Sequence, residues 1–175
     1  MSAEPQVTTT TGLPTGRWHL LPEASTAVFA VANFGFRTVT GTIPLREGTV
    51  DVDAGGVVDG VHVVLDLDGL DTASWRRDAD LRRPRLLDVD RHPELAFDAT
   101  AMTPAGSGWR VDGRLSARGT STPLAVSVTA TEAGREQAGI RATGVLDRRE
   151  LGVRAPRLLI GHLVRITVDS RWARG

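Results

Sequence analysis

Residues 109–130 read WRVDGRLSARGTSTPLAVSVTA, and this stretch decides the fold. From Trp109 to Ala117 every second residue is apolar or small, and the residues between them are Arg, Asp or Ser. The alternation returns from Leu124 to Ala130, after a turn-prone stretch at 119–123. A side-chain period of two places alternate residues on opposite faces of a strand. The stretch therefore predicts two half-buried antiparallel strands joined by a turn.

The same alternation extends outward in both directions along the chain. It is present at 61–67, 95–101, 140–146 and 164–172, and further strands are predicted at 18–21, 25–34 and 38–52. Roughly eight such strands are enough to close a small barrel, which leaves no exposed sheet edge. We therefore expect an all-β fold: one extended eight-stranded antiparallel β-barrel, lipocalin-like in form, over residues 17–175. Residues 1–16 have little to bury and predict a disordered N-terminal tail.

The charge-rich run at 75–97 is the exception to this pattern. Asp71, Thr72 or Ser74 can cap a helix, Asp78 and Arg82 have the spacing of an ion pair on one helix face, and Pro84 ends the run. Between residues 76 and 94 there are six Arg against five acidic residues, so the segment is not of one sign. We interpret it as a short helix within 72–85 that crosses one end of the sheet with its charges in water.

The composition excludes several classes of function. The chain has 175 residues and 21 residues of each charge sign, so no overall field attracts nucleic acid or an anionic membrane. There is no Cys, which excludes disulfides and thiolate metal sites. The N-terminus does not resemble a secretory signal, and no apolar stretch approaches the roughly 20 residues that span a bilayer. We expect a soluble, cytoplasmic protein with no membrane span and no nucleic-acid partner.

Candidate catalytic and metal-binding residues are sparse. The four histidines, 19, 62, 92 and 162, are scattered without metal-ligand spacing, and His62 lies on the polar face of its strand. The sequence DRRE at 147–150 contains a candidate acid–base pair in Asp147 and Arg148. At a strand end, such a pair more often fixes a turn. We predict no metal, no cofactor and no catalytic residue.

Small residues on the inward faces indicate a cavity. A solid core would place larger apolar side chains there to reach close packing. An alternative explanation, for the glycines, is that they relieve strain where strands bend to close the barrel. The small inward positions are Ala99, Ala101, Gly113, Ala117, Ala130, Ala142 and Gly144.

An ordered set of motifs between Trp18 and Trp172 resembles the YceI-like family, which are lipocalin-like polyisoprenoid-binding proteins. The matching positions are Pro22, Ser25, Phe29, Val31, Gly35, Val39, Gly41, Asp71, Thr72, Arg77, Asp78, Leu81, Leu87, Asp88, Pro93, Phe97, Gly113, Leu115, Arg118, Gly119, Pro123, Asp147, Arg148 and Gly152. The resemblance implies an extended eight-stranded barrel whose tubular apolar interior holds a long isoprenoid or fatty amphiphile. It implies no catalytic residues, and it matches the charge-rich run to a helical crossover beside the barrel mouth.

From the inward faces and this resemblance, we expect an apolar cavity that binds or transports a long-chain apolar molecule, such as an isoprenoid, a quinone-like compound or a fatty amphiphile. Two alternatives stay open: an enzyme that acts on a hydrophobic substrate in the cavity, and a ligandless, stress-related structural barrel. A homodimer stays open as well. The residues expected to line the cavity are Phe29, Val31, Phe34, Ile43, Val63, Leu65, Leu86, Phe97, Leu115, Val128, Ile140, Ala142, Leu146, Val164 and Ile166.

Overall fold

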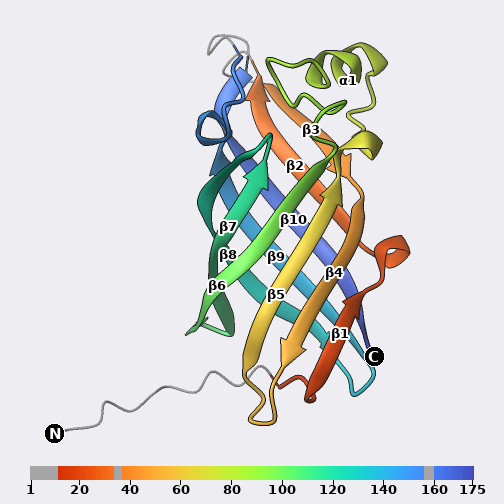
Figure 1. Cartoon of the computed structure of the whole chain (residues 1–175), viewed down its shortest axis with the longest axis vertical. Coiled ribbons are helices and arrows are strands. Elements are labelled where there is room, and N and C mark those ends of the chain that lie inside the picture. The colour runs from red at the N-terminus through yellow and green to blue at the C-terminus, as the bar shows by residue number, and fades with distance from the viewer. Residues whose placement is uncertain (1–11, 34–36, 156–159) are drawn as a thin grey trace, which may run out of the picture.

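The structure is a computed structural model of the chain and describes residues 12–33, 37–155 and 160–175. Strands dominate it, with one short α-helix and three 3-10 helices (Figure 1). In chain order the elements are β1 (Gly16–Leu20), η1 (Pro22–Ala24), β2 (Thr26–Asn33), β3 (Arg37–Ile43), β4 (Leu45–Val52), β5 (Val58–Asp66), η2 (Leu67–Gly69), α1 (Trp75–Leu81), β6 (Glu94–Ala105), β7 (Gly108–Ala117), β8 (Thr120–Ala133), β9 (Gln137–Asp147), η3 (Arg148–Leu151) and β10 (Ile160–Arg174).

The strands form a closed antiparallel β-barrel of eight strands, as the alternation predicted. The order around the ring is β1, β4, β5, β6, β7, β8, β9 and β10, and β10 pairs back onto β1. At this seam Trp18 lies opposite Arg174, and Leu20 lies opposite Trp172. Above the seam, the upper half of β10 pairs with β2, and β2 pairs with β3. The stretch at 109–130 supplies β7 and most of β8, which pair from Trp109 opposite Val128 to Ala117 opposite Thr120.

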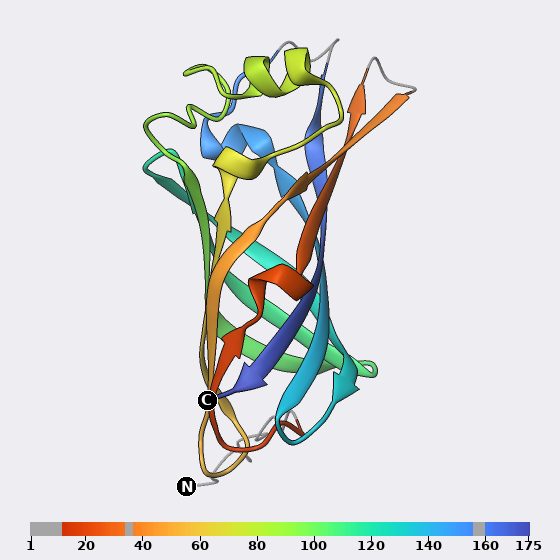
Figure 2. The same ribbon diagram turned by 90° about the vertical axis from the view of Figure 1, so that its right-hand side faces the viewer.

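Two breaks explain why ten strands make an eight-stranded barrel. The 3-10 helix η1 separates β1 from β2, and Pro44 separates β3 from β4 within the strand that the sequence predicted at 38–52. Proline has no backbone N–H to offer a neighbouring strand, so it interrupts the ladder. Above Pro44, β3 turns away from β5, and Thr42 instead forms an isolated bridge to Asp71. Figure 2 shows the β2–β3 hairpin leaning outward at this end of the barrel.

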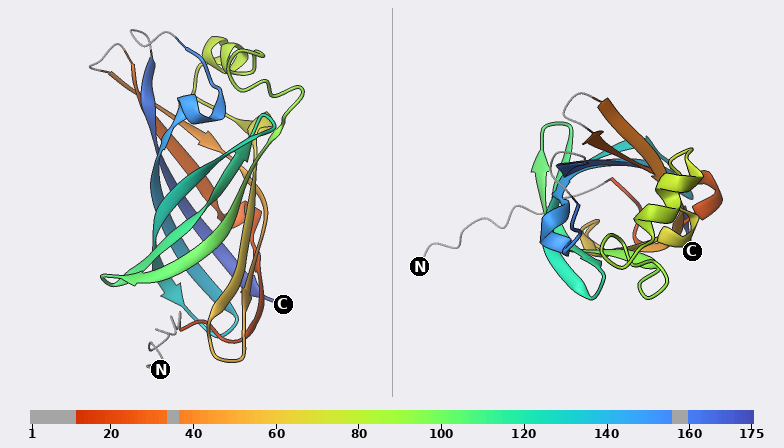
Figure 3. Two further views of the ribbon diagram at one scale, coloured as in Figure 1. Left: turned by 60° about the vertical axis from the view of Figure 1, so that its left-hand side comes forward. Right: turned by 90° about the horizontal axis from the view of Figure 1, so that it is seen from above.

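The gap at this end is spanned by residues 67–93, which we call the mouth cover (Figure 3). It contains η2 and α1, and α1 falls within the range that the sequence predicted. Ser74 caps α1 by accepting a hydrogen bond from the backbone N–H of Arg77 at 3.4 Å.

The predicted pair between Asp78 and Arg82 does not form. Asp78 Oδ1 instead accepts hydrogen bonds from the backbone N–H and the hydroxyl of Thr72, at 3.0 and 2.6 Å. Arg82 Nη2 reaches Asp68 at 2.8 Å and Asp90 at 3.2 Å. These contacts join the two ends of the mouth cover to its helix. Helical spacing predicts only pairs within one helix, so it could not predict these partners.

The buried apolar side chains form two clusters inside the barrel. One includes Trp18 and Trp172, with Leu67 and Val89 of the mouth cover. Leu13, from the segment that the sequence predicted to be a tail, also packs against this cluster, whereas residues 1–11 of that segment lie outside the described residues. The other cluster gathers Leu86, Leu115, Leu124, Leu146, Leu151 and Val153.

Candidate functional site: the barrel cavity

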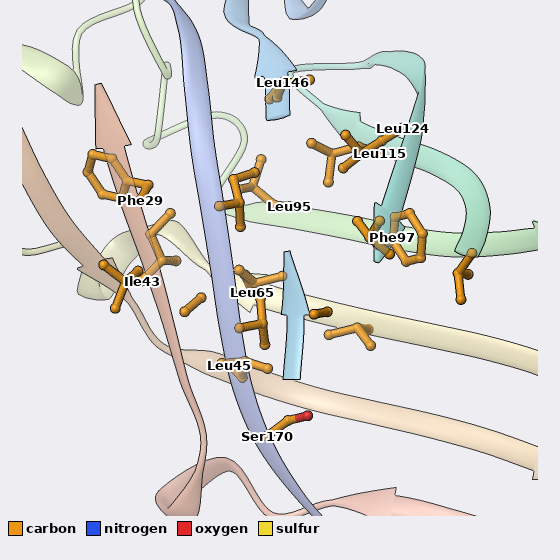
Figure 4. Close-up of a pocket in the computed structure, with 18 of the residues that line it drawn as sticks. Phe29, Ile43, Leu45, Leu65, Leu95, Phe97, Leu115, Leu124, Leu146 and Ser170 are labelled. Carbon is orange, nitrogen blue, oxygen red and sulfur yellow. The ribbon is translucent and has the colours of Figure 1, made fainter. Parts of the chain in front are cut away.

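The barrel encloses an apolar cavity with a volume of about 300 Å³ (Figure 4). Its walls come from strands all around the ring and from the mouth cover. Among the described residues that line it, Arg148 and Ser170 are the members that are neither aliphatic nor aromatic. A cavity lined in this way offers contacts to a hydrocarbon chain and very little to a polar molecule.

Fourteen of the fifteen residues that the sequence assigned to the cavity line it, and Phe34 lies outside the described residues. Their role in binding a ligand stays a prediction. The sequence assignment missed other lining residues, including the aromatic residues Trp18, Trp109 and Trp172, as well as Leu13, Met102, Leu87, Leu151, Val153, Arg148 and Ser170. Trp109 and Trp172 belong to alternating segments, so the strand pattern already indicated their inward direction.

One stretch of the predicted inward face is wrong because of a β-bulge. The pairing of β6 with β7 shifts register between Ala99, opposite Gly113, and Ala101, opposite Asp112. One extra residue exchanges the two faces of a strand. Ala101 is therefore exposed, and its neighbour Met102 lines the cavity.

The inward glycines are covered by side chains and do not open the lumen. A Cβ built on Gly113 would lie 2.6 Å from Cε2 of Phe97, and one built on Gly41 would lie 2.6 Å from Cε1 of Phe29. At Gly144 the nearest atom is Cγ1 of Val126, at 3.0 Å. The glycines at 41 and 113 therefore give room to aromatic rings against the wall, while the alanines Ala117, Ala130 and Ala142 do face the cavity.

Two tryptophans occupy the end of the barrel that lies away from the mouth cover. Trp18 is fully buried, and its Nε1 donates to the carbonyl of Pro14 at 3.0 Å. Trp172 Nε1 donates to Oγ of Ser170 at 2.9 Å, and that hydroxyl donates to the carbonyl of Ile140 at 3.0 Å. The indole N–H groups of Trp18 and Trp172 therefore both have partners inside the protein, as is usual for buried tryptophans.

Leucines of the mouth cover complete the cavity at the other end. Leu81, Leu86 and Leu87 line it. Arg118, in the β7–β8 turn, holds the cover in place by donating from Nη2 to the carbonyl of Pro84 at 2.8 Å and from Nη1 to the carbonyl of Gly152. The backbone N–H of Arg154 donates to the carbonyl of Arg85 at 3.2 Å and provides a second attachment.

Arg148 is a buried cation at the mouth. Its side chain donates from Nε to the carbonyl of Gly161 at 2.8 Å, from Nη1 to that of Val153 at 2.8 Å and from Nη2 to that of Ala155 at 3.1 Å. The guanidinium thereby ties the chain after η3 to the start of β10. This agrees with the prediction that the residue fixes a strand end.

Asp147 makes its ion pair with Arg149. Its Oδ2 lies 2.6 Å from Arg149 Nη2, and its Oδ1 accepts from the backbone N–H of Arg149 at 3.0 Å, which caps η3. The hydrogen bond from the Arg149 side chain is the main reason that the pKa of Asp147 lies well below its ordinary value. An ionised carboxylate held in this way is a poor proton donor or acceptor near neutral pH.

The remaining polar side chains do not gather into a metal site in the part of the chain that the structure describes. Within 12–33, 37–155 and 160–175, no cluster of three or more His, Asp or Glu side chains has the arrangement of a metal site. His62 lies on the outer wall, with Nδ1 at 2.6 Å from Oδ1 of Asp98. Within the same residues, no helix has the length and apolar character needed to cross a bilayer.

Comparison with known sequences gives one consistent family. The sequence pattern that describes the YceI-like domain matches residues 18–171. A UPF0312 protein of Yersinia pestis (strain Pestoides F) is 25% identical over 131 residues, which is 71% of this chain and 68% of the relative. A UPF0312 protein of Pseudomonas savastanoi pv. phaseolicola is 27% identical over 135 residues, which is 73% of this chain and 70% of the relative.

Solved structures share the fold at low sequence identity. BcnA of Burkholderia cenocepacia superposes with a TM-score of 0.75 at 16% identity, covering 87% of this chain and 98% of its own. A polyisoprenoid binding domain from Saccharophagus degradans superposes with a TM-score of 0.70 at 12% identity, covering 90% of this chain and 98% of its own. At these sequence identities, the similarity to the two solved structures shows a shared fold.

Proposed function

The chain belongs to the YceI-like domain family, and on that premise we propose that it binds a long apolar molecule, an isoprenoid, a quinone-like compound or a fatty amphiphile, inside its barrel. The observation that carries the proposal is the cavity of about 300 Å³ with its almost entirely apolar wall. The polyisoprenoid binding domain from Saccharophagus degradans, which has the same fold, supports the choice of ligand class.

The energetics of apolar burial favour a long chain over a compact ligand. Each methylene removed from water contributes roughly 0.8 kcal/mol, so about ten carbons offer on the order of 8 kcal/mol before costs. Ordering a flexible chain and losing its translational freedom take back several kcal/mol. Affinity in the micromolar range is therefore expected, and it should rise with chain length until the cavity is full.

Binding without chemical change fits the mouth better than catalysis does. Asp147 is paired with Arg149, and the Arg148 guanidinium donates to backbone carbonyls, so the two candidate catalytic residues do not form an acid–base pair with each other. The open volume inside the barrel also argues against a purely structural role, because a structural barrel gains stability from a filled core.

The test is calorimetry with two series of ligands, isoprenoid alcohols and fatty acids of increasing length, together with native mass spectrometry of the purified protein and extraction of its lipids. We expect affinity to increase with length in both series and then to level off, with little dependence on salt for the alcohols. Affinity that ignores chain length would contradict binding inside the cavity.

A further inference from the structure

The mouth cover carries an exposed tryptophan on its outer side. Trp75 is the first residue of α1, which lies at the mouth end of the barrel (Figures 1 and 3), and it is 76% exposed. The other three tryptophans of the chain, at positions 18, 109 and 172, line the barrel cavity. A single exposed apolar side chain is common on protein surfaces, so what matters is how Trp75 is held and which groups share its surface.

The backbone before Trp75 is fixed by hydrogen bonds. Thr72 is buried, and Arg77 donates to it from Nε to the hydroxyl oxygen and from Nη2 to the carbonyl, both at 2.9 Å. Ala73 has a φ of +60°, a left-handed conformation that costs energy in a residue other than glycine. Trp75 is therefore held in water by a hydrogen-bonded and strained turn, and not by a loose loop.

Exposed arginines share the mouth end with this tryptophan. Cζ of Arg76 lies 5.2 Å from the centroid of the Trp75 ring, a cation–π contact that leaves the charge in water. Several other arginines at this end are exposed in the same way, and among the described residues they take part in no ion pair. With Arg76 included, the set is Arg37, Arg76, Arg85, Arg91 and Arg154.

The exposed acids of the mouth cover are occupied by partners in the chain. Asp68 and Asp90 pair with Arg82, and Asp80 pairs with Arg83 at 3.2 Å. The carboxylate of Asp71 accepts a hydrogen bond from a backbone N–H at 2.7 Å. Cations without an ionic partner therefore outnumber such acids at this end of the barrel.

The far end of the barrel has a different character. Its β4–β5 turn carries Asp53 and Asp59, which are exposed and take part in no ion pair within the part of the chain that the structure describes. Figure 1 shows this turn at the opposite end from α1. The balanced charge of the whole chain therefore conceals a difference between its two ends, and the mouth end is the one suited to an anionic surface.

An anionic lipid bilayer fits both features of the mouth end. Tryptophan is enriched at the interface between a membrane and water, where its ring lies at the level of the head groups. Arginines close to such a surface are attracted by the lipid phosphates. A protein partner usually needs several large apolar side chains at the core of its interface. The exposed face of α1 does not offer them, because beside Trp75 it carries Ala79 and the charged residues Arg76 and Asp80.

We propose that the mouth end of the barrel docks on the surface of bilayers that contain anionic phospholipid. Trp75 lies among the head groups, and the five exposed arginines face the phosphates. This goes beyond the proposed function, because docking does not require an occupied cavity. It also places the mouth against the bilayer, so that an apolar molecule can pass between the two without crossing bulk water. The attachment is peripheral and reversible, since one indole ring and a few arginines bind far more weakly than a spanning helix.

The test is flotation of the purified protein with two kinds of vesicle, phosphatidylcholine alone and an equal mixture of phosphatidylcholine and phosphatidylglycerol. We expect tighter binding to the mixed vesicles, and this advantage should shrink as salt screens the arginines. Acrylamide, an uncharged quencher, reports the orientation. The emission of Trp75 is the difference between the wild type and Trp75→Phe, and the mixed vesicles should protect it from quenching.

Variants with matched controls locate the docking surface. Trp75→Ser should weaken binding to the mixed vesicles by about tenfold, the scale of burying one large apolar side chain. Arg85→Gln should weaken it by about fivefold, the scale of one cation near an anionic surface. The controls should bind as the wild type does: Val28→Ser changes an exposed apolar residue on the outer wall of β2, and Arg135→Gln changes an exposed arginine in the β8–β9 turn, at the far end of the barrel.

Three results would overturn the docking surface. The first is no binding to the mixed vesicles. The second is binding that leaves Trp75 open to acrylamide, or that the variants and controls weaken alike, because the protein would then attach by another face. The third is protection of Trp75 that rises with protein concentration in the absence of vesicles, which would assign this face to a second copy of the chain.

A variant with a filled cavity separates docking from uptake of lipid. Ala142 lines the cavity, so Ala142→Phe narrows the lumen and leaves the outer side of the mouth cover unchanged. It should float with the mixed vesicles as the wild type does. Loss of flotation in this variant would show that lipid entering the barrel holds the protein on the vesicle, and this would overturn docking by Trp75 and the arginines while supporting the proposed function.

Discussion

The ring of Phe29 lies against Gly41, its partner across the β2–β3 ladder, so closely that a side chain on the glycine would collide with it. Phe97 on β6 also lies this closely against Gly113 on β7, although the ladder partner of Gly113 is Ala99 and that of Phe97 is Leu115. An aromatic ring over a strand glycine covers exposed backbone and gains packing that the glycine cannot supply. Both rings are thereby held along the wall, and the axis of the barrel stays open.

Replacing Gly41 with Ala should therefore both destabilise the barrel and narrow its cavity. The new methyl would overlap Phe29 and would lie 2.9 Å from Cγ2 of Thr72, so the ring has to move toward the lumen. We expect a loss of about 1 to 3 kcal/mol in urea unfolding, the usual cost of overpacking, and weaker ligand binding. Gly60→Ala is the control, since the nearest atom to its Cβ is Asp51 Oδ2, at 3.6 Å. Equal stability of the two variants would contradict the contact.

A large residue at position 142 should block the cavity. Ala142 lines it and lies opposite Val128 and Val168, which also line it. Ala142→Phe should lower the affinity for farnesol by about tenfold or more, because the new ring takes the volume of several methylenes. Thr143→Phe adds the same ring one residue along the strand, on the exposed outer face, and should bind as the wild type does. If the two variants bind alike in calorimetry, the ligand lies elsewhere.

Loss of the Arg148 guanidinium should be costly, because three backbone carbonyls at the mouth would lose a donor. We expect Arg148→Ala to lower the free energy of unfolding by about 3 kcal/mol. In a chain of this length that corresponds to roughly 10 °C in the melting temperature. Arg148→Lys should recover little of it, because an ammonium group cannot reach three acceptors as a planar fork does. An unchanged melting temperature in Arg148→Ala would show that the contacts are replaceable by water.

The ion pair of Asp147 and Arg149 should make stability depend on pH on the acid side. The pKa of Asp147 is lower in the folded protein than in the unfolded chain, mainly because Arg149 donates a hydrogen bond to the carboxylate. The stability that the ionised Asp147 contributes is therefore fully present above the pKa of an aspartate in the unfolded chain, about 4. It is lost as the pH falls further, toward the lower pKa that Asp147 has in the folded protein. Asp147→Asn should be less stable than the wild type at pH 7, and the difference should narrow in acid.

The control for this pair is a double-mutant cycle measured by urea unfolding at several pH values. Asp147→Asn and Arg149→Ala should each remove the same interaction, so the double variant should lose less than the sum of the two single losses. A difference between wild type and Asp147→Asn that stays constant from neutral to acid pH would contradict the assignment.

The alternation predicted the barrel and the inward faces because burial on one side of a strand leaves a period of two in the sequence. It failed where the backbone departs from that period. The bulge at 99–101 has no residue signature of its own, so the alternation predicts Ala101 on the inward face, whereas Ala101 is exposed and Met102 lines the cavity. The helical spacing of Asp78 and Arg82 was equally uninformative, because their partners come from residues that the fold brings together.

The mouth was less predictable than the walls. Arg148 lines the cavity although its sequence neighbours, Arg149 and Glu150, are exposed. Nothing local distinguishes a buried arginine from an exposed one, because its burial depends on carbonyls supplied by a loop and by the next strand. For Gly113 the sequence offers two explanations, a cavity or relief of strain at a bend, and neither includes the Phe97 ring that covers it, because that contact depends on the register of two strands.

The seam between β1 and β10 sets a condition on how the chain reaches this fold. Trp18 and Arg174 are partners at this seam although nearly the whole sequence separates them. Contacts between residues so far apart in sequence are among the slowest to form during folding, because a long loop must be closed. Until β10 has left the ribosome, the growing sheet has two unpaired edges and an uncovered apolar face. The backbone N–H of Gly175 donates to the carbonyl of Arg17 at 2.9 Å, so the two ends of the domain meet once the seam has closed. A circularly permuted chain that joins these ends and begins in the turn at 106–107 would have β1 and β10 as consecutive strands, and it should fold faster than the natural order.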